Sequence, residues 1–246
     1  MTLNLKKINP IDVKFCGLTS VKDINLAASM GARYAGFVFF EKSPRSLTFE
    51  MGRKLALEAP IGLAKVALVV DAQFSYLDVL ISQVPIDMIQ LHGSESPKIV
   101  HDVRKRYGLP VMKAIGISSE SDLKKVKSYC EVCDQILFDA KPSSKDALPG
   151  GNGLQFDWSV LANKKWSKPW MLAGGLNAAN VEKAVKVTNA RQLDLSSSIE
   201  LSPGIKDPEK IKDFMQALEQ CNFEKNLDKI IVKLLHEWLL IYVIPH

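Results

Sequence analysis

The sequence predicts a single-domain α/β protein in which eight parallel strands close into a (β/α)8 barrel. Short apolar or β-branched runs recur along the chain, and each is followed by a segment with helical features. Alternation of buried strands with helices is typical of a parallel sheet, and eight such units are typical of a closed barrel. The length of 246 residues suits one domain of this kind.

Eight segments are rich enough in apolar residues to form the buried strands of such a sheet. In chain order they are Asp12–Cys16, Arg33–Phe39, Leu63–Val70, Asp87–Leu91, Val111–Ile117, Gln135–Asp139, Pro169–Ala173 and Gln192–Leu195.

The predicted helices follow these strands, and several begin with a residue that can cap the free N–H groups of a first turn. Ser20, Thr48 and Asn177 are such caps. The sixth helix has the weakest pattern, because the long loop Ala140–Phe156 precedes it, and loops of that length are often binding loops or lids. The eight predicted helices are Ser20–Met30, Thr48–Ala59, Ser75–Gln83, Ser96–Tyr107, Ser119–Tyr129, Asp157–Leu161, Asn177–Val187 and Pro208–Leu218.

The barrel is therefore expected to span residues 12–218, followed by a C-terminal extension over residues 219–246. This extension holds an amphipathic run around Leu227–Leu235 and an apolar run over Trp238–Ile244. It could pack on the barrel, form an oligomer contact or stay loosely ordered. Packing against its own domain is favoured, because an exposed apolar end would be a liability.

Composition and charge favour a compact protein that binds a small anionic molecule. The net charge of +5 is modest, and the lysines and arginines are spread along the chain, whereas a nucleic-acid binder more often concentrates them. The apolar run near the C-terminus is shorter than the ~20 residues of a membrane span, and residues 1–10 lack the apolar core of a signal peptide. We expect a cytoplasmic monomer or homodimer that binds neither nucleic acid nor membrane.

The four cysteines are too few for a disulfide framework in a chain of this length and suit a reducing compartment. Cys130 and Cys133 have the spacing of half a zinc site, but no second pair follows, and they precede the sixth strand on the structural face of the barrel. The sequence therefore predicts structural thiols and no metal site.

Two segments predict a phosphate-binding site. Each is an apolar strand that runs into a turn of small residues, and together they offer Gly174, Gly175, Ser196 and Ser197. Glycine lets backbone N–H groups approach an anion, and serine hydroxyls add donors. In barrels of this class, phosphate commonly binds at the loops after strands seven and eight. Two ordinary tight turns are the alternative interpretation.

Reactive side chains are expected at the C-terminal ends of barrel strands. The first strand ends at Cys16, the fourth at His92 and the sixth at Asp139, while Arg45 lies in the loop after the second strand. Each has an ordinary alternative role. Cys16 could be a small buried hydrophobe, Asp139 a turn former and Arg45 a solvated loop residue.

These motifs, in this order, resemble the phosphoribosylanthranilate isomerase family of tryptophan biosynthesis over about residues 13–207. The shared segments are Val13-Lys-Phe-Cys-Gly-Leu-Thr19, Gly36-Phe-Val-Phe39, Ser43-Pro-Arg45, Gln90-Leu-His-Gly93, Phe138-Asp-Ala140, Pro149-Gly-Gly151, Phe156-Asp-Trp158, Leu172-Ala-Gly-Gly-Leu-Asn177 and Ser202-Pro-Gly-Ile-Lys206. The resemblance implies a cofactor-free Amadori rearrangement of N-(5-phosphoribosyl)anthranilate to 1-(2-carboxyphenylamino)-1-deoxyribulose 5-phosphate.

Conversion of an aldosylamine into an aminoketose needs an acid at the ring oxygen and a base at the C2 proton. Asp139 is the candidate acid, which requires a raised pKa. Cys16 is the candidate base, which requires a pKa lowered from about 8.5 by nearby positive potential. Arg45 can bind the anthranilate carboxylate through its planar fork. His92 either touches the substrate or forms hydrogen bonds within the mouth.

The residues alone leave two roles open for Asp194. The resemblance implies that it faces the amine or a hydroxyl of the substrate, and otherwise it is a buried polar group that needs a partner.

The chain departs from the family pattern at three positions. Ser198 stands where the family usually has glycine, and a positive φ there would be costly. Asn152 and Leu154 stand where threonine and lysine are more frequent, so the loop after strand six could close differently.

Two other functions remain open from the sequence alone. One is the histidine-pathway phosphoribosyl isomerase, in which an aspartate replaces the strand-one cysteine, and Cys16 argues against it. The other is a barrel retained as a binding or assembly module, against which the intact acid, base and arginine argue.

Overall fold

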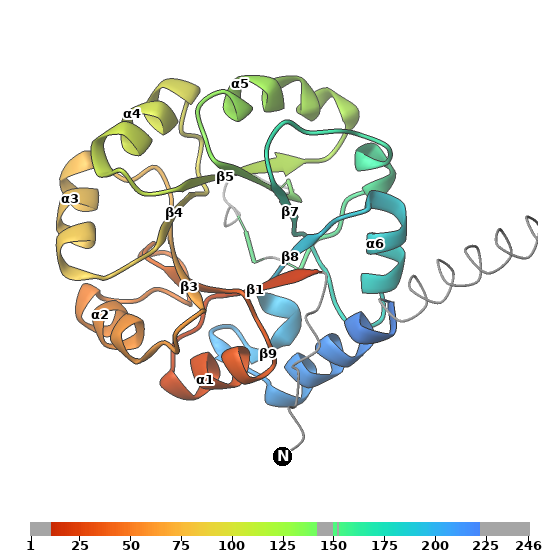
Figure 1. Ribbon diagram of the computed structural model, residues 1–246, viewed down its shortest axis with the longest axis horizontal. Coiled ribbons are helices and arrows are strands. Elements are labelled where there is room, and N and C mark those ends of the chain that lie inside the picture. Colours follow the sequence, from red (N-terminus) through yellow and green to blue (C-terminus); the bar gives the residue numbers. More distant parts are fainter. Residues whose placement is uncertain (1–10, 142–149, 152, 222–246) are drawn as a thin grey trace, which may run out of the picture.

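A computed structural model describes residues 11–141, 150–151 and 153–221, and it confirms the closed barrel. Eight parallel strands are hydrogen-bonded in chain order into a ring, and the helices surround it (Figure 1). The first strand pairs with the last, with Lys14 opposite Asp194. The strands are β1 Asp12–Cys16, β2 Tyr34–Val38, β3 Ala64–Val69, β4 Met88–Leu91, β5 Val111–Ile117, β6 Gln135–Ala140, β7 Trp170–Leu172 and β8 Gln192–Leu195.

The helices of the first four units lie close to the predicted ranges. The side chains of Ser20, Thr48 and Ser96 each accept a hydrogen bond from a first-turn N–H, as N-caps do. The α-helices are α1 Val21–Ser29, α2 Phe49–Glu58, α3 Phe74–Gln83, α4 Pro97–Tyr107, α5 Val126–Cys130 and α6 Val181–Thr188. A further helix begins at Pro208 and continues to Cys221, the last described residue, so the predicted extension lies outside the described residues from position 222 onward.

Two predicted helices are largely 3-10 turns. In the fifth unit, η1 Glu120–Lys125 precedes the short α5, and the Asp122 carboxylate accepts the N–H groups of Ser118 and Ser119 at the start of η1. In the sixth unit, the predicted helix over residues 157–161 is the 3-10 turn η2 Trp158–Leu161.

The predicted N-cap at Asn177 is wrong, because α6 begins at Val181. The side-chain Oδ1 of Asn177 accepts the backbone N–H of Ala179 and of Asn180, so this side chain closes a separate turn. The Asn180 side chain then donates to the backbone carbonyl of Gly175 at 2.9 Å. A turn tied to the glycine pair therefore separates this pair from the helix.

A short antiparallel hairpin follows the eighth strand, and the sequence did not predict it. After the 3-10 turn η3 Ser197–Ile199, β9 Glu200–Ser202 pairs with β10 Ile205–Lys206. The hairpin packs against the loops after β1 and β2, because Thr19 donates to the carbonyl of Gly204 and a Cβ on Gly204 would lie 2.7 Å from the carbonyl oxygen of Pro44.

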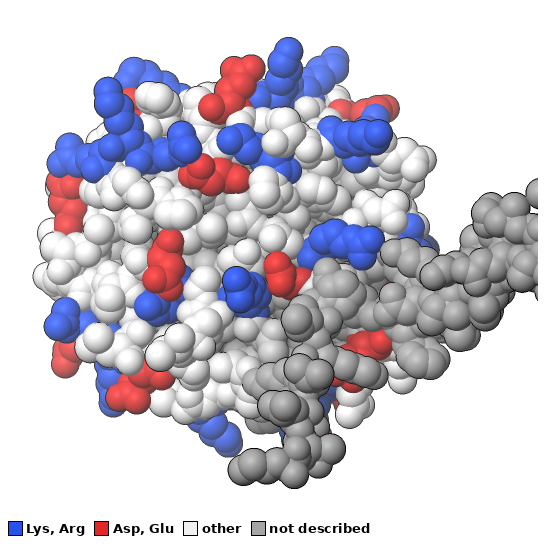
Figure 2. All heavy atoms as spheres, viewed as in Figure 1, with Lys and Arg blue, Asp and Glu red and all other residues white. Residues whose placement is uncertain are grey.

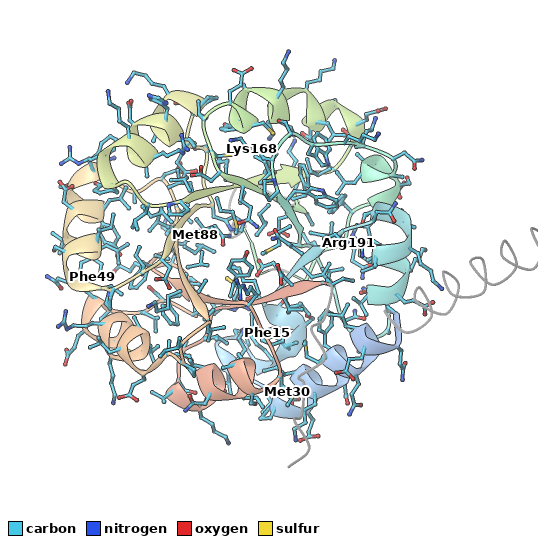
Figure 3. All side chains as sticks on the ribbon, viewed as in Figure 1. Phe15, Met30, Phe49, Met88, Lys168 and Arg191 are labelled. Carbon is cyan, nitrogen blue, oxygen red and sulfur yellow. The ribbon has the colours of Figure 1, made fainter. Side chains whose placement is uncertain are left out.

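Side chains fill the ring of strands and the space between the ring and the helices (Figure 3). The main core lies between strands and helices, and it includes Phe15, Phe37, Phe138 and Phe214, which are fully buried. A smaller cluster inside the ring contains Met112, Ala114, Leu137, Met171 and Ala173. Charged groups are also buried in the interior, and most of them belong to the site described below.

On the face seen in Figure 2, lysines and arginines are interspersed with aspartates and glutamates. Within residues 11–141, 150–151 and 153–221, no helix is long and apolar enough to cross a membrane.

Candidate active site

One cavity at the C-terminal ends of the strands brings together every residue predicted for the site. It contains about 790 Å³ of space, including the solvent at its entrance. Its lining includes Cys16, Arg45, His92, Asp139, Gly174, Gly175, Asp194, Ser196 and Ser197. Their roles remain predictions, but the geometry places them within reach of one small molecule.

Glycine and serine turns form one wall of this cavity. Gly174 and Gly175 have φ of +87° and +66°, which non-glycine residues rarely adopt. A Cβ would lie 2.9 Å from the backbone nitrogen of Ala140 at the first position and 2.9 Å from the carbonyl oxygen of Leu154 at the second. Both positions therefore need glycine, for conformation and for space.

The expected strain at Ser198 is absent. Ser198 lies inside η3, and it is not among the described non-glycine residues that have positive φ. Its side chain lines the same cavity beside Ser196 and Ser197, so this chain has three consecutive serines along the wall. Of the other two departures, Leu154 belongs to the described loop over Gly175, while Asn152 lies outside the described residues.

An apolar wall stands beside the thiol. Val38 and Leu68 are buried against Cys16, and the partly buried Phe40 and Val70 pack on the same cluster. These four side chains also line the cavity. The cavity is therefore apolar next to β1, β2 and β3 and rich in hydrogen-bond donors next to β7 and β8.

Cys16 shares its face of β1 with Lys14, because residues two apart in a strand point to the same side. A Cβ on Gly36 of β2 would lie 2.9 Å from the Cys16 Sγ and 3.1 Å from the Lys14 Nζ, so both atoms occupy the space that Gly36 leaves open. The Lys14 ammonium is fully buried and donates to Asp194 Oδ1 at 2.9 Å. Thiol, ammonium and carboxylate thus form one buried cluster.

The electrostatics of this cluster correct one expectation. Burial raises the pKa of the Cys16 thiol above its ordinary value, although Lys14 acts in the opposite direction. Desolvation thus outweighs the positive potential that was expected to lower this pKa. For Lys14, burial opposes the charged form, but the attraction of Asp194 and Cys16 outweighs it and the pKa is raised, so the ammonium stays charged.

Asp139 is the second-last residue of β6, and its two carboxylate oxygens have different contacts. Its Oδ1 accepts the backbone N–H of Ala140 at 2.8 Å. Its Oδ2 lies 3.3 Å from His92 Nε2, and the side-chain amide of Gln90 contacts the other ring nitrogen at 2.8 Å. A Cβ on Gly150 would lie 2.9 Å from Nε2 and 3.0 Å from Oδ2. The loop after β6 can therefore cover this pair only with glycine at position 150.

Arg45 already has a carboxylate partner inside the protein. Its Nε and Nη2 donate to the two oxygens of Glu200 at 2.8 and 2.6 Å. Its Nη1 lies beside Gly151, where a Cβ would be 2.7 Å away, and both residues line the cavity. The guanidinium therefore reaches the cavity wall while Nε and Nη2 are held by Glu200.

Four residues of this site were missed by the sequence reasoning: Lys14, Gly36, Glu200 and Lys206. Lys14 had a signal, because it precedes Cys16 by two positions on the same strand. Lys206 lay in a quoted motif without a role, and Glu200 pairs with Arg45, a residue 155 positions away. No local pattern reports such a distant contact.

The Cys130 and Cys133 thiols are buried. Burial raises the pKa of Cys133 to about 12, which agrees with a structural thiol. In the part of the chain that the structure describes, no group of three or more His, Cys, Asp or Glu residues is arranged to hold a metal ion.

Both the closed barrel and the position of the cavity at its C-terminal strand ends are typical of (β/α)8-barrel enzymes, and the chain is of that class. A family model described as N-(5'-phosphoribosyl)anthranilate (PRA) isomerase matches residues 13–217. The chain therefore belongs to the phosphoribosylanthranilate isomerase family, as its motifs predicted.

Individual relatives agree with this assignment. The chain is 54% identical over 206 residues to the N-(5'-phosphoribosyl)anthranilate isomerase of Cereibacter sphaeroides, covering 84% of this chain and 97% of that protein. The enzyme of Paracoccus denitrificans is 48% identical over 205 residues, covering 83% and 95%. The crystal structure of the Thermotoga maritima enzyme has a TM-score of 0.76 and 32% identity, covering 85% of this chain and 99% of that one.

Proposed function

We propose that this chain catalyses the Amadori rearrangement of N-(5-phosphoribosyl)anthranilate in tryptophan biosynthesis. Family membership supports the reaction. A related structure, with a TM-score of 0.73 and 30% identity, holds reduced 1-(o-carboxyphenylamino)-1-deoxyribulose 5-phosphate. The observation that carries the proposal is the single cavity in which Cys16 and Asp139 lie between an apolar wall and a wall of hydrogen-bond donors.

The two walls suggest how the substrate is oriented. The phosphate binds at the backbone N–H groups of Gly174 and Gly175 and at the serine hydroxyls after β8, since backbone and hydroxyl donors suit an anion. The anthranilate ring packs against the apolar wall next to Cys16. The carboxylate of the anthranilate then meets the Arg45 guanidinium at Nη1, the nitrogen that does not donate to Glu200. The ribose lies between these ends, within reach of the candidate acid and base.

Asp139 acts first in this scheme. Its Oδ2 gives a proton to the ring oxygen of the aminosugar, the ring C–O bond breaks, and an open-chain imine forms. The Ala140 N–H keeps Oδ1 in place during this step. The His92 ring is held by Gln90 and lies beside Oδ2, the oxygen that gives the proton, so it fixes the position of that oxygen.

Cys16 acts second. As a thiolate it removes the proton from C2 of the protonated imine, and the electrons move to form the enolamine. Tautomerisation, in which C1 gains a proton and the 2-hydroxyl loses one, gives the aminoketose. Cys16 then releases its proton and Asp139 regains one through solvent, so the enzyme returns to its starting form. The reaction only moves protons and electron pairs within the substrate, so acid and base suffice chemically. The buried Lys14 ammonium stabilises the thiolate and so offsets part of the cost of burying it. Lys14 thereby increases the fraction of Cys16 that can act as a base.

The test follows the loss of anthranilate fluorescence from freshly made substrate. Cys16→Ser and Asp139→Asn should each lower kcat by about 10²–10⁴-fold, the usual contribution of one acid or base. Cys133→Ser is the matched control for the thiol, because it changes a buried cysteine outside the cavity, and it should keep the wild-type rate. Equal rates for wild type and both site variants would overturn the mechanism, and an inactive wild type that still binds a phosphorylated analogue would favour a binding module.

We also propose a cytoplasmic location and a monomeric or homodimeric state. The buried thiols suit a reducing compartment. One related structure is described as derived from a dimeric enzyme of Thermotoga maritima. Sedimentation velocity of the full chain would measure the mass and decide between the two states.

A further inference from the structure

Arg45, Glu200 and Lys206 form a buried three-charge cluster beside the cavity, and the mechanism uses only Arg45 among them. The Glu200 carboxylate accepts Arg45 through both oxygens and also accepts the Lys206 ammonium at 2.6 Å. The three side chains are at most 5% exposed. One anion thus holds two cations at a site where charge is expensive to bury.

The fold explains why the cluster forms there. Glu200 starts β9 and stands opposite Lys206 in β10, so the hairpin register brings these two side chains together. Packing of the hairpin against the loop after β2 brings Arg45 to the other side of the same carboxylate. The contact therefore joins the loops after strands two and eight.

The two cations contact different parts of the cavity wall. Arg45 lines the cavity with its Nη1 beside Gly151, where the substrate carboxylate is proposed to bind. Lys206 also donates to the backbone carbonyl of Ser196 at 3.1 Å, and Ser196 begins the donor wall proposed for the phosphate. Glu200 is the group common to both contacts.

We propose that Glu200 is a positioning residue that holds the carboxylate-binding arginine and the phosphate-binding turn of Ser196 at a fixed separation, so that both ends of the substrate are recognised together. This inference rests on the proposed function. Without the carboxylate, two buried cations would repel one another, and neither the guanidinium nor the Ser196 turn would keep its place.

The sign of the effect distinguishes positioning from simple electrostatics. Removal of a negative charge near an anion site should tighten anion binding through the field alone. If Glu200 acts by position, its removal should instead weaken anion binding at both ends.

The experiment measures binding of two separate probes, inorganic phosphate and anthranilate, by competition against reduced 1-(o-carboxyphenylamino)-1-deoxyribulose 5-phosphate. Glu200→Gln should raise the dissociation constant of each probe at least about threefold, the scale expected for coupled neighbours. Glu200→Asp keeps the charge but shortens the side chain, so it should also weaken both probes, and it serves if the first variant does not fold. Glu209→Gln, which changes an exposed glutamate paired with Lys212, is the matched control and should change neither constant.

Tighter binding, unchanged binding, or weakening of only one probe in a folded Glu200 variant would overturn the inference. Failure of the proposed function gives a different result, because it shows in the wild type, which would then bind neither probe or would bind them without turning over the substrate. Thermal unfolding of each variant checks that the binding constants are those of folded protein.

Discussion

Replacement of Lys14 by methionine tests whether this buried charge controls the proposed base. Methionine keeps a long unbranched side chain in the barrel interior but removes the ammonium beside Cys16. Both the Lys14 Nζ and the Cys16 Sγ lie about 3 Å from the point that a Cβ on Gly36 would occupy. The variant therefore removes a full positive charge from the immediate surroundings of the thiol.

The expected size of the effect follows from Coulomb's law. At a separation of about 5 Å and an effective dielectric constant of about 20, one charge stabilises the thiolate by about 3 kcal/mol. That energy corresponds to a pKa change of about 2 units. Asp194 already offsets part of the lysine charge, since their atoms are 2.9 Å apart, so we expect a rise of about 1–2 units in the pKa of Cys16.

The sign of the pH dependence follows from the form of Cys16 that reacts. A base is active as thiolate, and below its pKa the thiolate fraction rises tenfold per pH unit. Burial raises this pKa in the wild type, so kcat/KM should still increase with pH above neutrality. Loss of the ammonium should move this rising limb to higher pH and lower kcat/KM at neutral pH about 10–100-fold, with the difference shrinking as pH increases.

The assay is the pH profile of kcat/KM, combined with the rate at which iodoacetamide alkylates Cys16, measured on its peptide by mass spectrometry. Alkylation also requires thiolate, and it does not depend on turnover. Lys14→Arg keeps the charge and should leave the limb near its wild-type position. The reasoning is refuted if folded Lys14→Met loses activity while the limb and the alkylation profile stay in place.

Two further variants test a buried ion pair outside the cavity and the loop that approaches Asp139. The ion pair joins Lys113 Nζ to Glu95 Oε2 at 2.8 Å. Lys113→Met should destabilise the protein by about 3–5 kcal/mol, because it leaves the 4% exposed Glu95 without its ion partner in the interior; urea unfolding measures this, and the exposed-site variant Lys98→Ala should cost less than about 1 kcal/mol. Gly150→Ala should lower kcat/KM with little change in unfolding temperature, because its Cβ would lie 3.0 Å from Asp139 Oδ2. Wild-type kinetics in the alanine variant would show that the loop after β6 does not need to approach this carboxyl group.

The strands and the first four helices were predictable because their signals are local. An apolar run needs only its own side chains to favour a buried strand, and a serine before a helix caps it through a contact three residues away. The Ser20 and Thr48 caps confirm this. The prediction failed at Asn177, because its side-chain oxygen accepts N–H groups of a turn that precedes the helix, and Asn180 is the residue directly before α6.

The irregular connections were predicted less well because their conformation depends on neighbours distant in sequence. Pro203-Gly204 after β8 is a local turn signal, but the place of the hairpin depends on packing against loops after other strands. The concern about Ser198 failed for a related reason. It assumed a positive φ from the family's glycine, whereas the chain enters a 3-10 turn there, in which serine is unstrained.

That the candidate residues share one cavity could be predicted, but their electrostatic state could not. Strand-end position was enough to bring Cys16, Asp139 and His92 together, since barrel topology gathers the strand ends at one face. The partner of Lys14, however, lies 180 positions away and meets it only when β1 closes on β8. That closure also buries the thiol, and because burial penalises the thiolate more than the lysine favours it, the pKa rises instead of falling. A pKa is thus a property of the closed barrel, and the residue pattern that identifies a base does not determine when it is charged.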